Sequence, residues 1–302
     1  MNATQNTPAA PCQTATSQTH TGRRHPRGRR ARNRVLGLTA AAALTAAALL
    51  GTALGAGAAS AATTPGWLMG AGTLAGINAA DPALTAQVLS TPATYGAGSS
   101  LSGNPIQPGL AATPVLGYTS YAQFAADIQN SQISFPYKWV MYDPEEWAQT
   151  PLNEQQNPAR YMTLFGQLAH AHGLKVIMAP AMDLGYVPGA ANPRLPGETI
   201  VHWYIRANIA GAAATAGDIV NIQGESETTN LQQYDVLFNT AATQARATNP
   251  AIQMFAEVST VNGTLAQMTA AAQSISPNGY YIAAPGATAE AAQFVQNMQA
   301  TT

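Results

Sequence analysis

The sequence predicts an α/β fold, a (β/α)8 TIM-type barrel that occupies residues 62–302 as a single domain. Short apolar runs alternate with amphipathic helical stretches along this part of the chain, a pattern typical of a parallel sheet. Eight such strand–helix units can be counted, and eight units close a barrel. The 241 residues from 62 to 302 also match the usual length of such a domain.

The first 61 residues indicate an export signal that does not belong to the fold. Seven arginines lie between residues 23 and 34, and an Ala- and Leu-rich run follows over residues 35–58. It ends in Ala59, Ser60 and Ala61, small residues typical of a cleavage site. A retained membrane anchor is the alternative, but Gly and Thr dilute the run, so we favour cleavage and secretion. A long Arg-rich n-region is common in high-GC Gram-positive bacteria, and the export route, Sec or Tat, stays open.

The charge of the remaining chain excludes several classes of partner. All 14 Asp and Glu lie after residue 61 but only six of the 13 Lys and Arg do, which gives this part a net charge of −8. An acidic surface argues against nucleic acid and anionic membranes as partners. The only cysteine, Cys12, lies in the leader, so neither disulfides nor a cysteine metal site are expected. The oligomeric state is left open.

The strands are expected as short apolar runs near residues 67, 94, 115, 139, 176, 219, 252 and 280. The weakest is residues 94–97, without which the barrel would be incomplete or the sheet open. Residues 98–113 are rich in Gly, Ser and Pro and indicate a long surface loop.

The helices follow the strands and are marked by start and stop signals. Asn157 and Pro158 are typical of a helix start, and Gly173, Gly217 and the pair Asn249-Pro250 mark breaks. Helices are expected near residues 82–89, 121–129, 158–173, 198–216, 232–248, 264–274 and 288–298.

Alternation along the strands predicts which side chains face the barrel interior. The inward set is Trp139, Met141, Asp143 and Glu145 on the fourth strand, Ile219, Asn221, Gln223 and Glu225 on the sixth, and Gln253, Phe255 and Glu257 on the seventh. The opposite faces are apolar and suit the helix layer. Polar residues inside a barrel are costly unless they are hydrogen-bonded or serve a site. On the fifth strand the same alternation brings Asp183 to the end of the barrel, beside Tyr186.

Five carboxylates are predicted to meet at one end of this barrel. They are Asp143, Glu145, Asp183, Glu225 and Glu257. In such barrels the active site lies at the C-terminal ends of the strands, which is where all five are expected. Helix capping or pairing with arginine is the better interpretation for Glu146, Glu227 and Asp235.

This arrangement resembles the glycoside hydrolase superfamily of (β/α)8 barrels. Asp143-Pro144-Glu145 is similar to the Asp-x-Glu ending of the fourth-strand motif in family 18 chitinases. In that family the Glu is the general acid and the Asp orients the acetamido group of the substrate. The two earlier acids of the motif fall on Met141 and Lys138 here, which puts the subfamily in doubt.

The chain is also similar to the large clan of retaining glycosidases, which carry an acid Glu after strand four and a nucleophile Glu after strand seven. Glu145 and Glu257 occupy those places, and Pro144 stands where that clan usually has Asn. Residues 142–172 further resemble secreted actinobacterial proteins, a likeness that implies no activity.

Hydrolysis of a glycosidic bond needs two carboxyl groups in different protonation states. Glu145 is the predicted general acid/base, and Asp143 its partner or a substrate orienter. Glu257 is the predicted nucleophile or second carboxylate, with Glu225 in reserve. Trp147 is expected to raise the pKa of Glu145 and to stack on a sugar ring. The other residues expected to contact a carbohydrate substrate are Gln223, Asn221, Asp183 and Tyr186.

Two other functions remain open at this point. The first is a barrel that binds a saccharide without cleaving it, or that is purely structural. The second is a hydrolase or lyase in which Asp143, Glu145 and Asp183 hold Ca²⁺ or Mg²⁺, but no ligand spacing marks such a site. We therefore expect neither a metal nor a cofactor. His170 and His172 lie on different helix faces and are not expected to share a metal.

Overall fold

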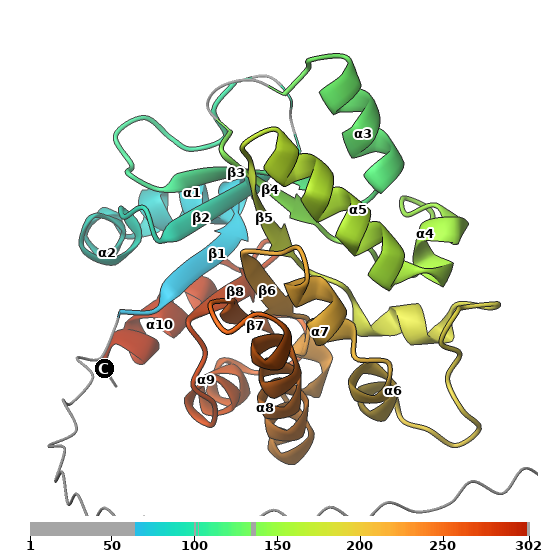
Figure 1. Ribbon diagram of the computed structural model, residues 1–302. Helices are drawn as coiled ribbons and strands as arrows, with labels where there is room; N and C mark the ends of the chain where they lie inside the picture. The colour runs from blue at the N-terminus through green and yellow to red at the C-terminus, as the bar shows by residue number, and fades with distance from the viewer. Residues whose placement is uncertain (1–63, 100, 102, 134–136, 301–302) are drawn as a thin grey trace, which may run out of the picture. The chain divides into compact units, whose positions relative to one another are not determined.

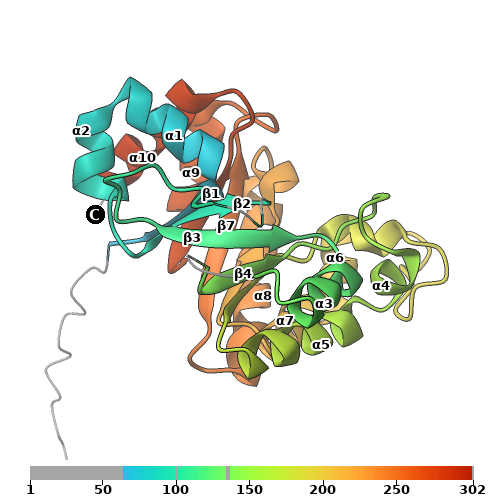
Figure 2. The same ribbon diagram turned by 90° about the horizontal axis from the view of Figure 1, so that it is seen from above.

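A computed structural model describes residues 64–99, 101, 103–133 and 137–300. The predicted signal peptide, residues 1–61, lies outside the described residues. Within them, eight parallel strands close into a barrel in chain order, from β1 to β8. Figure 1 shows the strands at the centre with the helices packed around them, and Figure 2 shows the same arrangement from above. The predicted (β/α)8 barrel is confirmed.

All eight predicted strands are present. They are β1 (Gly66–Gly70), β2 (Thr94–Gly98), β3 (Thr113–Tyr118), β4 (Trp139–Tyr142), β5 (Lys175–Met178), β6 (Ile219–Ile222), β7 (Gln253–Ser259) and β8 (Gly279–Ala283). The weakest prediction, β2, pairs on both sides, with Trp67 opposite Thr94 and Tyr95 opposite Thr113. The barrel closes between β1 and β8, where Gly66 lies opposite Gly279.

The helix layer contains α1 (Ala71–Ala80), α2 (Pro82–Leu84), α3 (Tyr121–Gln129), α4 (Leu152–Gln156), α5 (Pro158–Ala171), α6 (Ile200–Arg206), α7 (Ile209–Ala214), α8 (Leu231–Thr248), α9 (Leu265–Gln273) and α10 (Thr288–Gln299). The sequence did not indicate α1, and the predicted helix over residues 82–89 is α2 followed by a π-helical turn, η1 (Thr85–Leu89). The predicted loop connects β2 to β3 without a helix among its described residues. Its Ile106 is buried and would lie 2.3 Å from a Cβ added at Gly96, so it covers β2 in place of a helix.

The single helix predicted over residues 198–216 is wrong, because two helices, α6 and α7, occupy this stretch. Asn208 separates them in the left-handed conformation, with φ 53° and ψ 44°. Asn adopts this conformation more readily than most residues, since its short polar side chain tolerates it. Gly211 leaves room for the Asn208 side chain, which would lie 2.3 Å from an added Cβ. Thr199 caps the start of α6 by accepting a hydrogen bond from the His202 N–H.

Buried side chains form two cores, as the alternation predicts. The core inside the barrel contains Leu68, Tyr95, Val115, Met141, Ile177, Ala179, Ile219 and Phe255. The larger core between strands and helices contains Val140 and Tyr142, and Tyr142 stacks on Phe165 with ring centroids 4.7 Å apart. The apolar interior leaves the inward polar side chains gathered at the ends of the strands.

A buried carboxylate joins α4 to the start of α3. Glu154 is 1 % exposed and accepts hydrogen bonds from the backbone N–H groups of Tyr121 (2.7 Å) and Ala122 (3.0 Å). The hydroxyls of Ser120 (3.2 Å) and Tyr142 (2.8 Å) also donate to it. Because four donors converge on one carboxylate at a helix N-terminus, Glu154 has a structural role.

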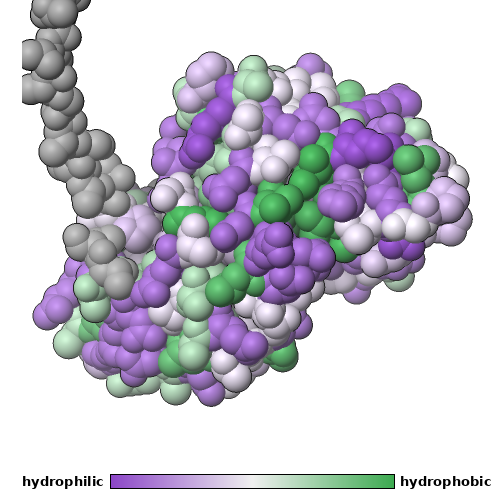
Figure 3. Space-filling model, turned by 90° about the horizontal axis from the view of Figure 1, so that it is seen from below, coloured by the Kyte–Doolittle hydropathy of each residue, from purple (hydrophilic) through white to green (hydrophobic). Residues whose placement is uncertain are grey.

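One face of the molecule is mostly polar at its surface. In Figure 3 one face carries mainly hydrophilic side chains, with a narrow apolar band across its middle. None of the helices in the described ranges is long and apolar enough to cross a membrane.

Candidate functional site

The predicted carboxylates follow four consecutive strands at their C-terminal ends. Asp143 directly follows β4, and its N–H bonds to the Tyr118 carbonyl of β3 at 2.8 Å. Asp183 lies in η2 (Met182–Tyr186), a 3₁₀ turn after β5, and Glu225 begins η3 (Glu225–Glu227) after β6. Glu257 is part of β7 itself. β4 therefore brings two acids, Asp143 and Glu145, to this end of the barrel, and β5, β6 and β7 bring one each.

Gln223 holds Asp143 in place. Its side-chain N–H groups donate to Asp143 Oδ1 at 2.6 Å and to the Ala179 carbonyl at 2.7 Å. Gln223, which follows β6, thus links the carboxyl group of Asp143 to the end of β5. Gln223 was predicted to bind sugar hydroxyls, but its amide N–H groups are directed to these two protein oxygens.

Glu257 lies deeper than the other acids. Its side chain accepts a hydrogen bond from Asn221 Nδ2 at 2.7 Å, and these residues are 6 % and 0 % exposed. Asn221 Oδ1 and Glu225 Oε2 are buried, with no hydrogen-bond partner among the described residues. Burial, with the charges of Glu225 and Asp143, raises the pKa of Glu257 well above its usual range. Asn221 was predicted to contact the substrate, but a substrate would have to reach a fully buried side chain.

Burial also raises the pKa of Glu145, to about 8, with smaller contributions from the negative charges of Asp143, Asp183 and Glu225. Its backbone N–H donates to Thr150 Oγ1 at 3.3 Å. The same oxygen accepts from the indole N–H of Trp147 at 2.9 Å, which fixes a ring that is 37 % exposed. The stacking of Trp147 on a sugar remains a prediction.

The other acids of the group have raised pKa values as well. Burial raises the pKa of Asp143 to about 7, an effect opposed by the hydrogen bond from Gln223 and reinforced by Glu225 and Asp183. Burial raises the pKa of Glu225 and of Asp183. For Asp183 a hydrogen bond opposes this rise, donated by the Glu146 N–H to Asp183 Oδ1 at 3.0 Å. The five carboxyl groups are therefore close enough to disfavour one another's ionisation.

Positive charge does not offset this repulsion in the part of the chain that the structure describes. The two ion pairs there join Arg206 to Glu198 and His170 to Asp218, and neither includes one of the five acids. Nor do any three Asp, Glu, His or Cys side chains there have the arrangement of a metal site. Burial and mutual repulsion therefore favour the protonated forms of these acids.

A cavity of about 300 Å³ lies beside the acids. Its lining consists of Gly70, Ala97, Gly98, Ser99, Gly117, Tyr118, Thr119, Met141, Asp143 and Tyr281. Tyr281 is not among the predicted site residues, but it pairs opposite Glu257, and the alternation along β8 directs its side chain inward. Burial and the charge of Glu257 raise the pKa of the Tyr281 phenol well above its usual value, so it is a hydrogen-bond donor.

Tyr186, a predicted substrate contact, lies outside this cavity. Its side chain is 52 % exposed, and the guanidinium carbon of Arg194 lies 4.5 Å from its ring centroid. Such a cation–π contact occupies one face of the ring.

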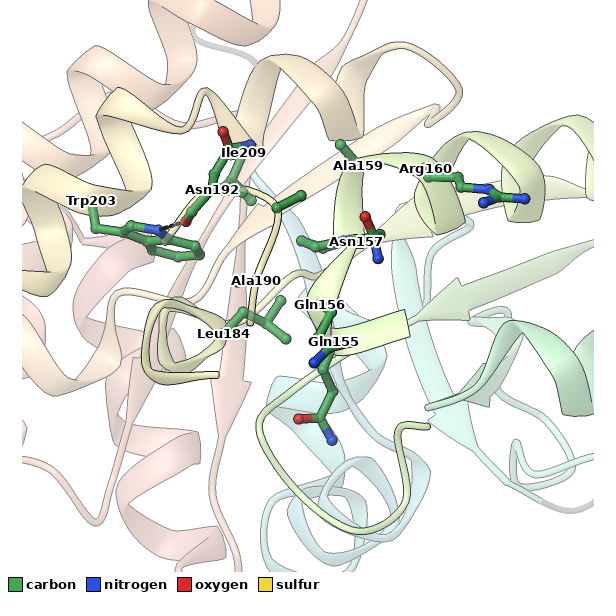
Figure 4. Close-up of a pocket in the computed structure, with 12 residues that line it drawn as sticks. Gln155, Gln156, Asn157, Ala159, Arg160, Leu184, Ala190, Asn192, Trp203 and Ile209 are labelled. Carbon is green, nitrogen blue, oxygen red and sulfur yellow. Dashed lines mark hydrogen bonds between the residues drawn. The ribbon is translucent and has the colours of Figure 1, made fainter. Parts of the chain in front are cut away.

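A second cavity, of about 200 Å³, contains none of the predicted site residues. Figure 4 shows it between the start of α5, Leu184 and Trp203. The indole N–H of Trp203 donates to the Asn192 carbonyl at 2.7 Å, and Gln156 donates to the Pro188 carbonyl at 2.8 Å. These bonds hold the segment after η2 against the helices, so this cavity belongs to the packing of that segment.

No protein-family model matches the chain, and a comparison with curated proteins finds no similar one.

The raised pKa values predict that stability falls as pH rises. Between the unfolded value near 4 and the folded values of about 7 for Asp143 and about 8 for Glu145, the folded protein binds more protons than the unfolded chain. The stability that this protonation contributes is complete below about pH 4 and is lost as pH rises through 7 to 8. Glu145→Gln should therefore raise Tm relative to wild type at pH 9 but not at pH 4, as thermal unfolding at the two pH values would show. An equal effect at both would contradict a raised pKa.

Proposed function

We propose that the protein is a glycoside hydrolase in which Glu145 protonates the leaving oxygen of a carbohydrate substrate. The observation that carries this proposal is a group of mutually repelling carboxyl groups at the mouth of the barrel, of which Glu145 has a pKa of about 8. A carboxylic acid that retains its proton at neutral pH is what general acid catalysis of glycoside cleavage requires.

Asp143 serves beside it as the partner that becomes ionised. Burial raises its pKa to about 7, but the N–H of Gln223 at 2.6 Å favours its carboxylate form, which predominates above neutral pH. A carboxylate there stabilises the positive charge that develops on the sugar ring, or orients a polar substituent of the substrate.

The second catalytic carboxylate comes from β6 or β7. Glu257 occupies the place implied by the likeness to retaining glycosidases, but it is 6 % exposed and bonded to Asn221. Glu225 is half-buried, and its Oε2, although buried, has no hydrogen-bond partner among the described residues. These observations favour Glu225 as the group that attacks the sugar or activates water.

The test is a screen of the purified protein against chromogenic glycosides and polysaccharides, with the variant Glu145→Gln beside it. Release of chromophore by the wild type alone supports the proposal. A protein that cleaves none of them, or a variant that cleaves them equally well, would overturn it.

A saccharide-binding protein without hydrolytic activity is the second candidate. It is favoured by the depth of Glu257 and by the amide groups of Asn221 and Gln223, which are directed to the acids. Calorimetric binding of an oligosaccharide without cleavage over days would support it.

Secretion is part of the proposal, because an extracellular hydrolase meets polysaccharides directly. Mass spectrometry of protein recovered from the medium should then show an N-terminus near residue 62. Full-length chain retained with the cells would contradict it.

A further inference from the structure

The two sides of the barrel mouth differ in the residues that they carry. The acids follow β4 to β7, whereas the cavity is lined at β1, β2 and β3 by small residues, namely Gly70, Ala97, Gly98 and Gly117. Asp143 and Tyr281 lie in the cavity wall. Small residues of three neighbouring strands thus leave open space beside Asp143.

The backbone does not itself require glycine at two of these positions. Neither Gly70 nor Gly117 has a positive φ. A Cβ added at Gly70 would meet only Thr73 Oγ1 at 3.8 Å, and one added at Gly117 would meet the Gly98 carbonyl and Met141 Cε, each at 3.7 Å. These are ordinary van der Waals distances, so the consequence of glycine here is open space, not relief of a clash.

The chemistry of the lining selects the kind of molecule that fits. Asp143, Thr119 and the phenol of Tyr281 offer hydrogen bonds, while Met141 and the ring of Tyr281 offer apolar contact. Lys, Arg and His are missing from the described residues that line it. An anionic ligand would find no counter-charge in this lining, and above neutral pH, where Asp143 ionises, it would also be repelled.

We propose that this cavity binds one uncharged terminal sugar ring of the substrate and excludes uronic acids, sialic acids and sugar phosphates. Its volume of about 300 Å³ is at the lower limit of small-molecule sites, which suits a single ring. A ring held there would contact Asp143 in the cavity wall. As a statement about substrate the proposal rests on the hydrolase function, but the binding of a sugar ring is testable without it.

The test fills the cavity with Gly117→Leu. Calorimetry measures binding of the methyl glycosides of glucose, galactose, mannose and N-acetylglucosamine, and of methyl glucuronide. The wild type should bind at least one of the neutral glycosides and not the glucuronide, and Gly117→Leu should weaken that binding about 10-fold or more. The wild type should also cleave the matching neutral 4-nitrophenyl glycoside faster than the glucuronide, and faster than Gly117→Leu does.

Gly72→Leu is the matched control, because Gly72 is an exposed residue of α1 where an added Cβ meets nothing within 4 Å. Circular dichroism and Tm show whether each variant folds. If Gly117→Leu does not fold, Gly117→Ala, whose added atom fits, replaces it with a smaller expected loss of affinity. The proposal is overturned if no neutral glycoside binds, if the glucuronide binds equally well, or if filling the cavity leaves affinity unchanged. Binding without turnover of any glycoside would instead leave this proposal standing and reject the hydrolase.

Discussion

Replacing Glu145 by Gln is expected to lower kcat/KM on a cleaved glycoside by about 10²- to 10⁴-fold, the usual contribution of a general acid. The amide has nearly the same shape but cannot deliver a proton to the leaving oxygen. Substrates with good leaving groups need less protonation and should lose less activity. Steady-state kinetics on two aryl glycosides with leaving groups of different acidity would measure both effects.

Glu146→Gln is the control for this experiment. Glu146 is the next residue in the chain, and its side chain is exposed. The hydrogen bond from its backbone N–H to Asp183 is kept in the variant. Its activity should stay within about two-fold of the wild type, since surface changes have small effects. Equal losses in both variants would mean that the local charge, and not the proton of Glu145, matters.

Replacing Glu154 by Ala is expected to lower the free energy of unfolding by about 3 kcal/mol or more, because each buried donor left without a partner costs about 1–3 kcal/mol. The substitution would deprive the start of α3 of its acceptor for the N–H groups of Tyr121 and Ala122, and would leave the Tyr142 hydroxyl unpaired. Urea unfolding of the two proteins at one pH would give the difference.

The exposed carboxylate of Glu146 again provides the comparison. Glu146→Ala removes an acid of the same size from the surface, so its free energy of unfolding should change by less than about 0.5 kcal/mol. A Glu154→Ala variant as stable as this control would show that water replaces the lost carboxylate at the start of α3.

Most of the barrel could be predicted from the sequence, because a parallel barrel requires a simple sequence pattern. An apolar strand is followed by a helix, and inward and outward residues alternate along each strand. Met141 and Phe255 inside, and Tyr142 outside, follow that rule. The break at Asn208 could not be predicted, because Asn is compatible with a helix interior and only its left-handed backbone, matched by Gly211, ends α6.

The candidate site was less accessible to sequence reasoning. The positions of the acids at the C-terminal ends of the strands predict the end of the barrel at which they lie, and alternation predicts which side chains face inward. Neither pattern shows which polar groups form hydrogen bonds with one another. The bonds of Gln223 to Asp143 and of Asn221 to Glu257 depend on neighbouring strands meeting in three dimensions. The four donors to Glu154 come from residues more than ten positions away in the chain. The residues next to Glu154 in the sequence therefore do not indicate that its carboxylate is buried.

The closure of the barrel between β1 and β8 links folding to occupancy of the cavity. Gly70 of β1 and Tyr281 of β8 both line that cavity, so its wall is complete only when the first and last strands have paired. A molecule bound there touches both sides of this seam and binds the closed barrel more tightly than the open one. By mass action the ligand stabilises the pairing of β1 with β8, and resistance to proteolysis should grow with ligand concentration. Protection from a protease can therefore report a ligand even when no reaction is seen.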